Sequence, residues 1–407
     1  MKDWKSNYIA LLAALVLALT GFSLSNPIIP LFLAEDIGIK DERSLKLWVG
    51  VISSCHALAM AVFAPIWGNL ADVLSRRMML LRAMFGGAIM TVLMVFVTSP
   101  WQVLALRAFS GCLTGTVAAA TVLTIGIVPA AHIGFALGLL QTGVAVGNAL
   151  GPLLGGVMAD FLGYRVAFIG TSVALAIAGF IVLKGVEDDK RSKEQRGKQP
   201  FSLLPNIKPI VNSPILLSLF FVTFSIQAAN TIASPMMPLY IRELVTRGLE
   251  KTGAVPQYIG STTGLVLGLS AATTALAAVL VGKYCSRIGY WRTLVICLGL
   301  GAALQIPQAL VTNVAQLAVF RSLASFFIGG SVPVLQALIA SSTEKKFQGT
   351  VFGFNSSVSQ TGGAVGPMIG SSVAILSYRA VFIATATLMG ICACITRWRQ
   401  HKRISPE

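Results

Sequence analysis

The sequence predicts an all-α membrane protein with twelve transmembrane helices in two six-helix, pseudo-symmetric bundles. Three observations lead to this prediction: a very apolar composition, twelve apolar runs of membrane-spanning length, and an internal repeat. Of the 407 residues, 55% are hydrophobic and 11% are charged, whereas a soluble domain usually carries about 25% charge. The mean hydropathy is +0.78. Such a chain would expose large apolar patches in water, so we expect lipid as its solvent.

Twelve runs approach the length of a bilayer crossing, which needs about 20 mostly apolar residues. The predicted spans are 8–33, 47–71, 78–98, 101–127, 134–159, 164–184, 214–241, 258–282, 291–311, 315–340, 349–374 and 378–397. The first run is too long for a removable signal peptide. It also carries Asn26, Pro27 and Pro30 where a cleavage site of small residues should stand. We therefore expect it to remain as the first span.

The basic residues predict the orientation of these spans. With the N-terminus inside, 20 of the 31 Lys and Arg lie in inside segments and 8 in outside segments, while Arg82, Arg107 and Arg321 fall within spans. This excess predicts a multi-pass protein of the cell (inner) membrane with both termini in the cytoplasm. The net charge of +16 then belongs to positive loops, and we expect no nucleic-acid partner.

The two halves of the chain resemble each other. The pairs YRVAFI 164–169 and YRAVFI 378–383, and NPIIPLFL 26–33 and SPMMPLYI 234–241, align at offsets of 214 and 208, and Arg107 aligns with Arg321. The polar stretch 185–213 separates the halves. We therefore predict a six-helix bundle over 1–184, a cytoplasmic linker over 185–213 and a second bundle over 214–407. Parallel repeats of this kind place a substrate site between the halves at mid-membrane.

A loop motif follows the second span. The segment GNLADVLSRR at 68–77 resembles the major facilitator superfamily motif GxLADRxGRR, with departures at Val73 and Ser75. The resemblance implies a cytoplasmic latch formed by Gly68, Asp72, Arg76 and Arg77, in which the carboxylate accepts from a helix N-terminus or an arginine. The alternative is a plain basic turn on the cytoplasmic side.

Two of the three arginines inside spans, Arg107 and Arg321, carry a further motif. The segment LALRAFSGCLTG at 104–115 resembles the fourth-helix motif LxxxRxxxGxxxG of the same superfamily, and Arg321 repeats the position of Arg107. An intramembrane arginine is costly and by default faces a wet cavity, so we predict that Arg107 and Arg321 line the substrate cavity. The alternatives are snorkelling to the outer headgroups and bracing between helices.

The fifth span carries the most specific motif. Its glycines and Pro152 resemble the antiporter motif GxxxGPxxGG of the drug:proton antiporter branch of the superfamily, and the eleventh span repeats part of it. Glycines four residues apart let helix backbones touch, and proline removes a backbone hydrogen bond. We predict a hinge at Gly147, Gly151, Pro152, Gly155, Gly156, Gly366 and Pro367. The alternative is ordinary packing of small residues.

All 15 Asp and Glu lie at segment ends or in loops, so the spans lack the cavity acid of many proton-coupled drug carriers. His56, inside the second span, is the candidate for proton coupling because its usual pKa suits proton exchange; a polar packing role is the alternative. Besides the two arginines, the predicted cavity residues are neutral amides: Gln141, Asn148, Gln227, Asn230, Gln336, Asn355 and Gln360.

The sequence contains no phosphate loop, catalytic triad or metal-ligand spacing, so we expect no enzyme, no metal and no cofactor. We predict a monomeric secondary transporter that exports drugs or amphipathic small molecules by alternating access, coupled to protons. One alternative is an uptake or exchange carrier for an organic anion or metabolite. Another is a membrane receptor that transports nothing.

Overall fold

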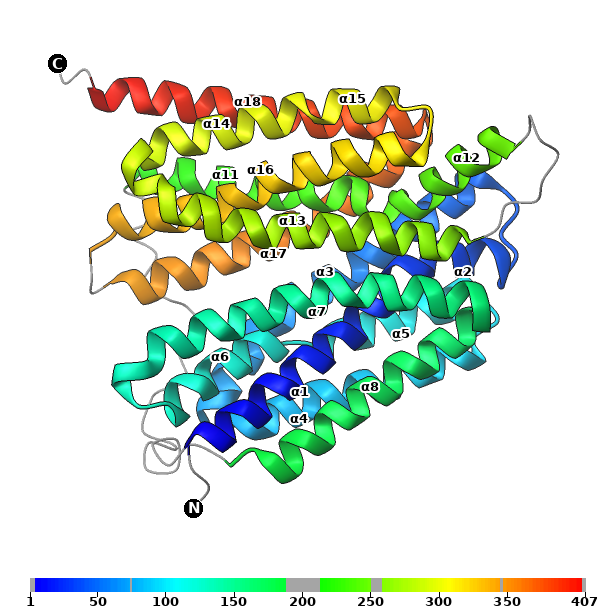
Figure 1. Cartoon of the computed structure of the whole chain (residues 1–407), viewed down its shortest axis with the longest axis horizontal. Coiled ribbons are helices and arrows are strands. Elements are labelled where there is room, and N and C mark those ends of the chain that lie inside the picture. Colours follow the sequence, from blue (N-terminus) through cyan, green and yellow to red (C-terminus); the bar gives the residue numbers. More distant parts are fainter. Residues whose placement is uncertain (1–3, 74, 188–212, 250–257, 345–346, 405–407) are drawn as a thin grey trace. The chain divides into compact units, whose positions relative to one another are not determined.

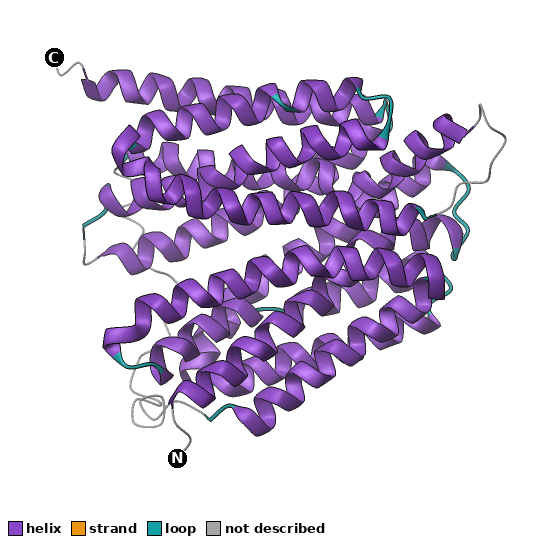
Figure 2. Ribbon diagram, in the orientation of Figure 1, coloured by secondary structure: helices purple, strands orange, loops and turns teal. Residues whose placement is uncertain are grey.

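The computed structural model describes residues 4–73, 75–187, 213–249, 258–344 and 347–404. Within these ranges every regular element is a helix (Figure 2). The helices form two compact units, coloured along the sequence in Figure 1. The first unit comprises 1–38, 58–203 and 257–268, and the second comprises 39–57, 204–256 and 269–407. Of the predicted linker, residues 188–212 lie outside the described residues.

The first unit contains the helices of the first half of the chain. These are α1 (Trp4–Ser25), η1 (Asn26–Ile28), α2 (Ile29–Glu35), α4 (Arg76–Leu93), η2 (Met94–Phe96), α5 (Pro100–Leu113), α6 (Thr116–Ile127), η3 (Ala130–His132), α7 (Ile133–Leu162) and α8 (Tyr164–Gly185). It also holds the end of α3 (Glu42–Val73) and the start of α13 (Ile259–Ile288). These two helices are each divided between the units.

The second unit contains the remaining helices. These are α11 (Pro214–Ala233), η4 (Ser234–Met236), α12 (Met237–Leu249), α14 (Tyr290–Ala303), α15 (Gln305–Leu310), α16 (Val314–Ser341), α17 (Gln348–Ala374) and α18 (Tyr378–Ile404). The start of α3 and most of α13 complete it.

All twelve predicted spans coincide with helices, which confirms the predicted all-α membrane fold. Eleven helical segments of the described residues are long and apolar enough to cross a membrane. The twelfth predicted span is α17, which has 27 residues but is more polar than the others because it carries Asn355, Gln360 and several serines and glycines. Its length still exceeds the roughly 20 residues that a crossing requires.

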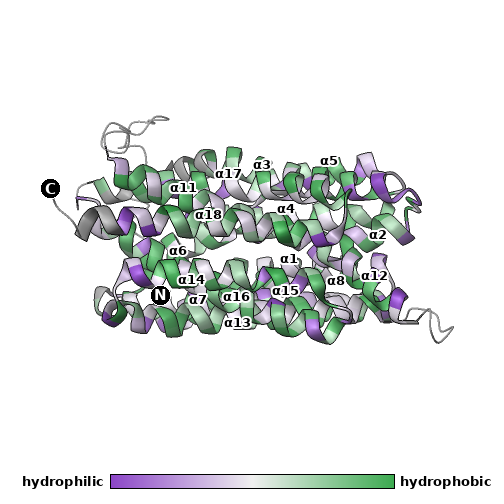
Figure 3. Ribbon diagram, turned by 90° about the horizontal axis from the view of Figure 1, so that it is seen from above, coloured by the Kyte–Doolittle hydropathy of each residue, from purple (hydrophilic) through white to green (hydrophobic). Residues whose placement is uncertain are grey.

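Each unit has its own apolar core. In the first unit Leu11 and Leu15 of α1 pack with Leu80 and Met84 of α4 and with Leu175 of α8. In the second, a corresponding cluster joins α11, α14, α16 and α18. Large apolar side chains also cover the outside of the helices, as at Phe135 and Val279, which are 75% and 67% exposed. Figure 3 shows hydrophobic residues along the helices and most hydrophilic residues near their ends, as lipid requires.

The proline pairs interrupt both members of the repeat at the same place. Short 3₁₀ turns, η1 and η4, separate α1 from α2 and α11 from α12. An aromatic contact that follows each turn is also repeated. The rings of Phe32 and Phe168 pack edge-on with centroids 5.1 Å apart, and the rings at the equivalent positions, Tyr240 and Phe382, have centroids 5.3 Å apart. The offsets found in the sequence therefore describe a structural repeat within the two units.

Two further predicted spans are not single helices. The span predicted over 101–127 is broken between α5 and α6, where Gly115 has a φ of +134°, a conformation that favours glycine. The span predicted over 291–311 is divided at Leu304 into α14 and α15. Pro307 follows this point and lacks the N–H that would bind the carbonyl of Ala303. Both helix breaks arise from the backbone properties of a single glycine or proline, which the hydropathy of the run does not show.

Candidate functional site

The glycines of the predicted hinge bring α7 against α1. A Cβ added at Gly147 would lie 2.8 Å from the Cβ of Leu19, and one added at Gly151 would lie 2.7 Å from the carbonyl oxygen of Thr20. A Cβ at Gly155 would overlap the carbonyl of Leu24. Such separations exclude any side chain, so this face of α7 is in backbone contact with α1.

The second unit repeats this contact between α17 and α11. A Cβ at Gly366 would lie 2.6 Å from the carbonyl oxygen of Ala228, and one at Gly362 would overlap the carbonyl of Phe224. Both α7 and α17 continue as helices through Pro152 and Pro367. The glycines therefore form packing faces in both units, and their role as a hinge stays a prediction.

A second contact of α7 involves Asp160, which the sequence analysis did not single out. The carboxylate accepts hydrogen bonds from the backbone N–H groups of Gly260 at 2.8 Å and Ser261 at 2.6 Å, in the first turn of α13. Beside it, a Cβ at Gly156 would overlap the carbonyl of Gly260. A carboxylate at a helix N-terminus is favourable because the unpaired amides carry partial positive charge. Asp160 thus joins the end of α7 to the beginning of α13 within the first unit.

Arg107 of α5 reaches the interrupted helix. Its Nη2 donates to the side-chain oxygen of Asn26 in η1 at 2.9 Å. The adjacent cavity, which Ser110 and Phe168 also line, has a volume of about 10 Å³. This is roughly the space of one water molecule. The structure thus assigns Arg107 a contact between α5 and η1, while its contact with substrate stays a prediction.

Arg321 of α16 is 8% exposed. Its Nε is buried and has no hydrogen-bond partner among the described residues. A charged guanidinium in this position is costly unless another group compensates it. The two arginines therefore occupy equivalent places in the repeat but have different surroundings.

The structure places the predicted neutral cavity residues in separate groups. Asn148 accepts a bond of 2.7 Å from Ser23, and Asn355, which is 3% exposed, accepts one of 2.8 Å from Thr223. Both pairs belong to the glycine-lined contacts, α1 with α7 and α11 with α17. Asn230 donates to Gln227 at 3.4 Å. Gln141 is exposed, whereas Gln336, Gln360 and His56 are half-buried.

If Arg107 and Arg321 contact the substrate, Arg107→Gln and Arg321→Gln should reduce transport of an anion about tenfold more than transport of a neutral compound of similar size. A charge-assisted contact with an anion is stronger than a neutral hydrogen bond. Initial transport rates for a matched pair of compounds measure this difference. Asn26→Ala removes the Arg107 bond but keeps the charge, so it should spare the preference for anions. Equal losses for both compounds would instead assign the arginines to helix packing.

The predicted latch is described in part. Gly68 and Asp72 lie in α3, but the surroundings of Gly68 and the side chain of Asp72 are outside the described part of the chain. Arg76 donates to the carbonyl oxygen of Val122 in α6 at 3.3 Å, and Arg77 donates to that of Leu183 near the end of α8. The arginines therefore connect the start of α4 to two other helices. The part played by Asp72 stays a prediction.

If Asp72 acts as the latch, Asp72→Asn should shift the conformational equilibrium toward the inward-open state by about 1–3 kcal/mol, the scale of a lost charge-assisted bond. The shape of the side chain is kept, so the change isolates the charge. Cysteine labelling from each side of the membrane measures the shift. An unchanged labelling pattern would leave Asp72 as part of a basic turn only.

Trp67 and Arg82 form a further cluster that sequence reasoning missed. The indole N–H of Trp67 donates to the carbonyl of Cys112 at 2.5 Å, and Arg82 donates to that of Thr114 at 3.3 Å. The guanidinium of Arg82 also lies 3.6 Å from the centre of the Trp67 ring. These donors satisfy carbonyls released by the break between α5 and α6. A tryptophan and an intramembrane arginine were the available indications, but neither identifies its partner.

Comparison with known proteins decides the family. The sequence model described as Major Facilitator Superfamily matches residues 11–306 and 252–406. The chain belongs to the major facilitator superfamily. It is therefore a multi-pass membrane transporter of small molecules and not an enzyme, as the sequence predicted.

Several relatives of this superfamily member match over nearly their whole length. Multidrug resistance protein MdtG of Proteus mirabilis (strain HI4320) is 35% identical over 388 residues, which cover 95% of this chain and 94% of the relative. The MdtG protein of Dickeya zeae (strain Ech586) is 36% identical over 405 residues, covering 99% and 96%. That of Escherichia coli (strain SMS-3-5 / SECEC) is 32% identical over 402 residues, covering 98% and 96%.

Solved structures share the fold at lower identity. A point mutant of the nucleoside transporter NupG has a TM-score of 0.82 at 13% identity, covering 96% of this chain and 99% of that one. The human organic anion transporter MFSD10 (TETRAN) has a TM-score of 0.64 at 19% identity, covering 97% and 100%. These similarities confirm the predicted fold.

Proposed function

We propose that this major facilitator protein is a proton-coupled antiporter that exports drugs or other amphipathic small molecules by alternating access. The observation that carries the proposal is its full-length similarity, at 32–36% identity, to relatives named multidrug resistance protein MdtG. The antiporter-type glycine motif of α7 and its copy in α17 support it, because they form the backbone contacts with α1 and α11. We further propose cytoplasmic termini, a monomer, and two bundles joined by a cytoplasmic linker.

For proton coupling we propose His56 or Asp72 of the predicted latch, because the spans hold no carboxylate away from their ends. His56 lies half-buried in α3. An imidazole can accept and release a proton, as a transport cycle coupled to protons requires.

A second candidate substrate class is an organic anion. Arg107 and Arg321 supply positive charge inside the membrane without a mid-span acid. A positive cavity would favour anionic, zwitterionic or neutral compounds over lipophilic cations. This candidate differs from the first in the transported compound, and the alternating-access mechanism is the same.

The test of export uses a bacterial strain that lacks its own multidrug pumps. Cells expressing the chain are compared for resistance to cationic, neutral and anionic drugs of similar size. In everted membrane vesicles, each compound that the cells resist should also evoke a proton flux. Export of any of these compounds with proton flux supports the proposal, and robust export of a lipophilic cation contradicts the positive cavity. Uptake of an organic anion without resistance contradicts export, and absence of any flux contradicts transport.

A further inference from the structure

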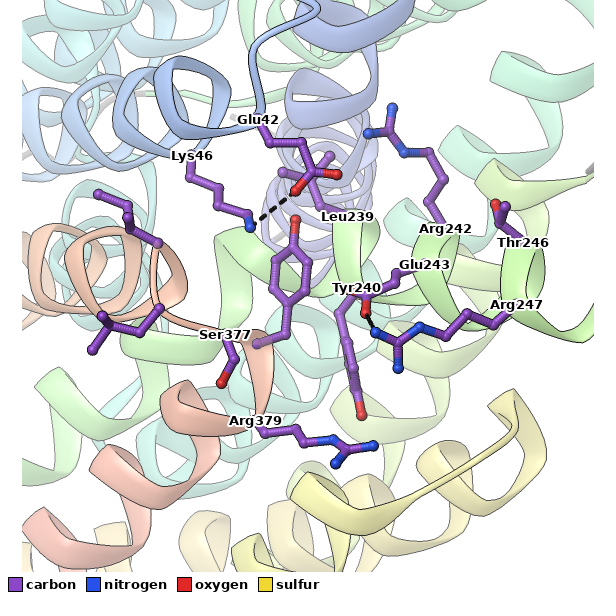
Figure 4. A pocket seen from close by; sticks show the side chains of 13 residues that line it. Glu42, Lys46, Leu239, Tyr240, Arg242, Glu243, Thr246, Arg247, Ser377 and Arg379 are labelled. Carbon is purple, nitrogen blue, oxygen red and sulfur yellow. Dashed lines mark hydrogen bonds and ion pairs between the residues drawn. The ribbon is translucent and has the colours of Figure 1, made fainter.

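A charged cavity lies within the second unit, and none of the predicted site residues lines it. Its volume is about 660 Å³. Three segments line it: the first turns of α3, the helix α12, and the chain from the end of α17 into α18. By the predicted orientation, all three lie at the outer ends of their spans. Figure 4 shows Arg242 and Arg379 on opposite sides of Tyr240 in this cavity.

The cavity holds four cations but two acids, so its charge is positive. Lys46 pairs with Glu42 at 3.2 Å, and Arg247 pairs with Glu243 (Figure 4). Among the described residues, neither Arg242 nor Arg379 has a carboxylate partner. The two acids are thus already paired with other cations.

The internal repeat shows that the first unit has an acid at this place and the second unit does not. In the first unit, Arg165 pairs with Asp36 at 2.8 Å. It also donates to the carbonyl oxygens of Val95 at 2.6 Å and Val97 at 3.3 Å. The repeat aligns Arg165 with Arg379, but it aligns Asp36 with Leu244.

The same alignment shows that the second unit has an additional cation. Ala34 of the first unit corresponds to Arg242. At one pair of equivalent positions the first unit has an acid and the second unit a leucine. At another pair the first unit has an alanine and the second unit an arginine. Together these differences leave two guanidinium groups around a cavity where the first unit has a closed ion pair.

The remaining walls are aromatic and apolar. Tyr240 and Tyr378 have ring centroids 5.7 Å apart, and the hydroxyl of Tyr240 donates to the carbonyl of Gln308 at 3.2 Å. Lys46 lies 4.4 Å from the centre of the Tyr378 ring. Leu376, which is 83% exposed, stands at the rim. The rings are therefore held in place, with apolar surface next to the arginines.

We propose that this cavity binds the phosphate group of an amphipathic molecule, with Arg242 and Arg379 as the anion ligands. Guanidinium groups bind phosphate oxygens through paired, charge-assisted hydrogen bonds. The apolar part of the molecule would lie against the tyrosine rings and Leu376. The phosphate has two natural sources, an anionic lipid of the surrounding leaflet or a soluble organic phosphate. The proposal does not depend on the nature of the exported compound.

The test uses the purified full-length protein in an uncharged detergent. Phosphatidylglycerol is the lipid probe, with phosphatidylcholine as its zwitterionic reference, and phenyl phosphate is the soluble probe. Native mass spectrometry follows the lipids and calorimetric titration follows phenyl phosphate. The variants are Arg242→Gln, Arg379→Gln and their combination. Arg43→Gln is the matched control, because Arg43 is an exposed arginine in the first turn of α3 that does not line the cavity.

We expect the unmodified protein to bind at least one anionic probe, and the double variant to bind it at least about tenfold more weakly. Arg43→Gln should change binding by less than about twofold, since exposed charges contribute little. Binding of phosphatidylglycerol alone identifies a lipid site, and binding of phenyl phosphate alone identifies a site for soluble phosphates.

Failure of both probes to bind would overturn the proposal. So would an equal loss in Arg43→Gln, which would indicate a general effect of surface charge. If a glutamine variant does not fold, Arg242→Lys and Arg379→Lys replace it. They keep the charge but lose the paired donors of arginine. Folded lysine variants with unchanged affinity would also contradict the assigned ligands.

Discussion

Replacing Gly151 by leucine is expected to reduce transport to less than about a tenth of its normal rate. A Cβ at this position would already lie 2.7 Å from the carbonyl oxygen of Thr20, and leucine adds three more carbons. Overpacking a close contact costs typically about 1–3 kcal/mol, and here the obstacle is backbone that cannot rotate away. The faces of α7 and α1 must then separate, so the states of the transport cycle cannot close correctly.

The measurement is drug resistance together with the amount of folded protein in the membrane. Gly138→Leu is the matched control, because Gly138 lies in the same helix and a Cβ there would meet nothing within 4 Å. The repeat offers a second pair in α17, where Gly366→Leu should be harmful and Gly363→Leu should be tolerated for the same reasons. A well-expressed Gly151→Leu protein with full transport would show that this contact is dispensable.

The sequence predicted the spans because length and hydropathy are properties of each segment alone. The twelve runs and the repeated segments at 26–33 and 234–241 needed no knowledge of neighbouring helices. The break at Gly115 was missed for the opposite reason. A glycine in an apolar run is compatible with a continuous helix, and the carbonyls that the break releases are bound by Trp67 and Arg82 of other helices, which the sequence does not identify.

The candidate site was predicted less completely, because its residues act through partners that sequence spacing does not name. The motif of α7 indicated a close helix contact, and the structure identifies α1 and α13 as the partners. Arg107 was expected in a cavity, and its hydrogen-bond partner proved to be Asn26. Asp160 was counted among the acids at span ends. Its contact with the first turn of α13 joins residues about 100 positions apart, which no local pattern could show.

Replacing Asp160 by alanine is expected to free the first turn of α13 from α7. Two charge-assisted hydrogen bonds are lost, and bonds to charged groups contribute about 1.5–3 kcal/mol each. The favourable interaction with the helix N-terminus is lost as well. Exchange of the Gly260 and Ser261 amide hydrogens should therefore accelerate by at least about tenfold, with Asp160→Asn intermediate because its amide oxygen still accepts a bond.

Transport should fall in the same order, least in Asp160→Asn and most in Asp160→Ala, because an alternating-access carrier depends on contacts between helix ends that form and break in each cycle.

Asp41→Ala is the control. Asp41 also accepts from a helix N-terminus, at 2.9 Å from the N–H of Ser44, but it caps its own helix α3 and is exposed. The hydroxyl and the backbone N–H of Ser44 lower the pKa of the Asp41 carboxyl. Its removal should fray α3 locally and leave exchange at Gly260 unchanged. Normal exchange at Gly260 and Ser261 in Asp160→Ala would show that the carboxylate does not hold α13, and equal losses in both variants would make helix capping in general, rather than this contact, the cause.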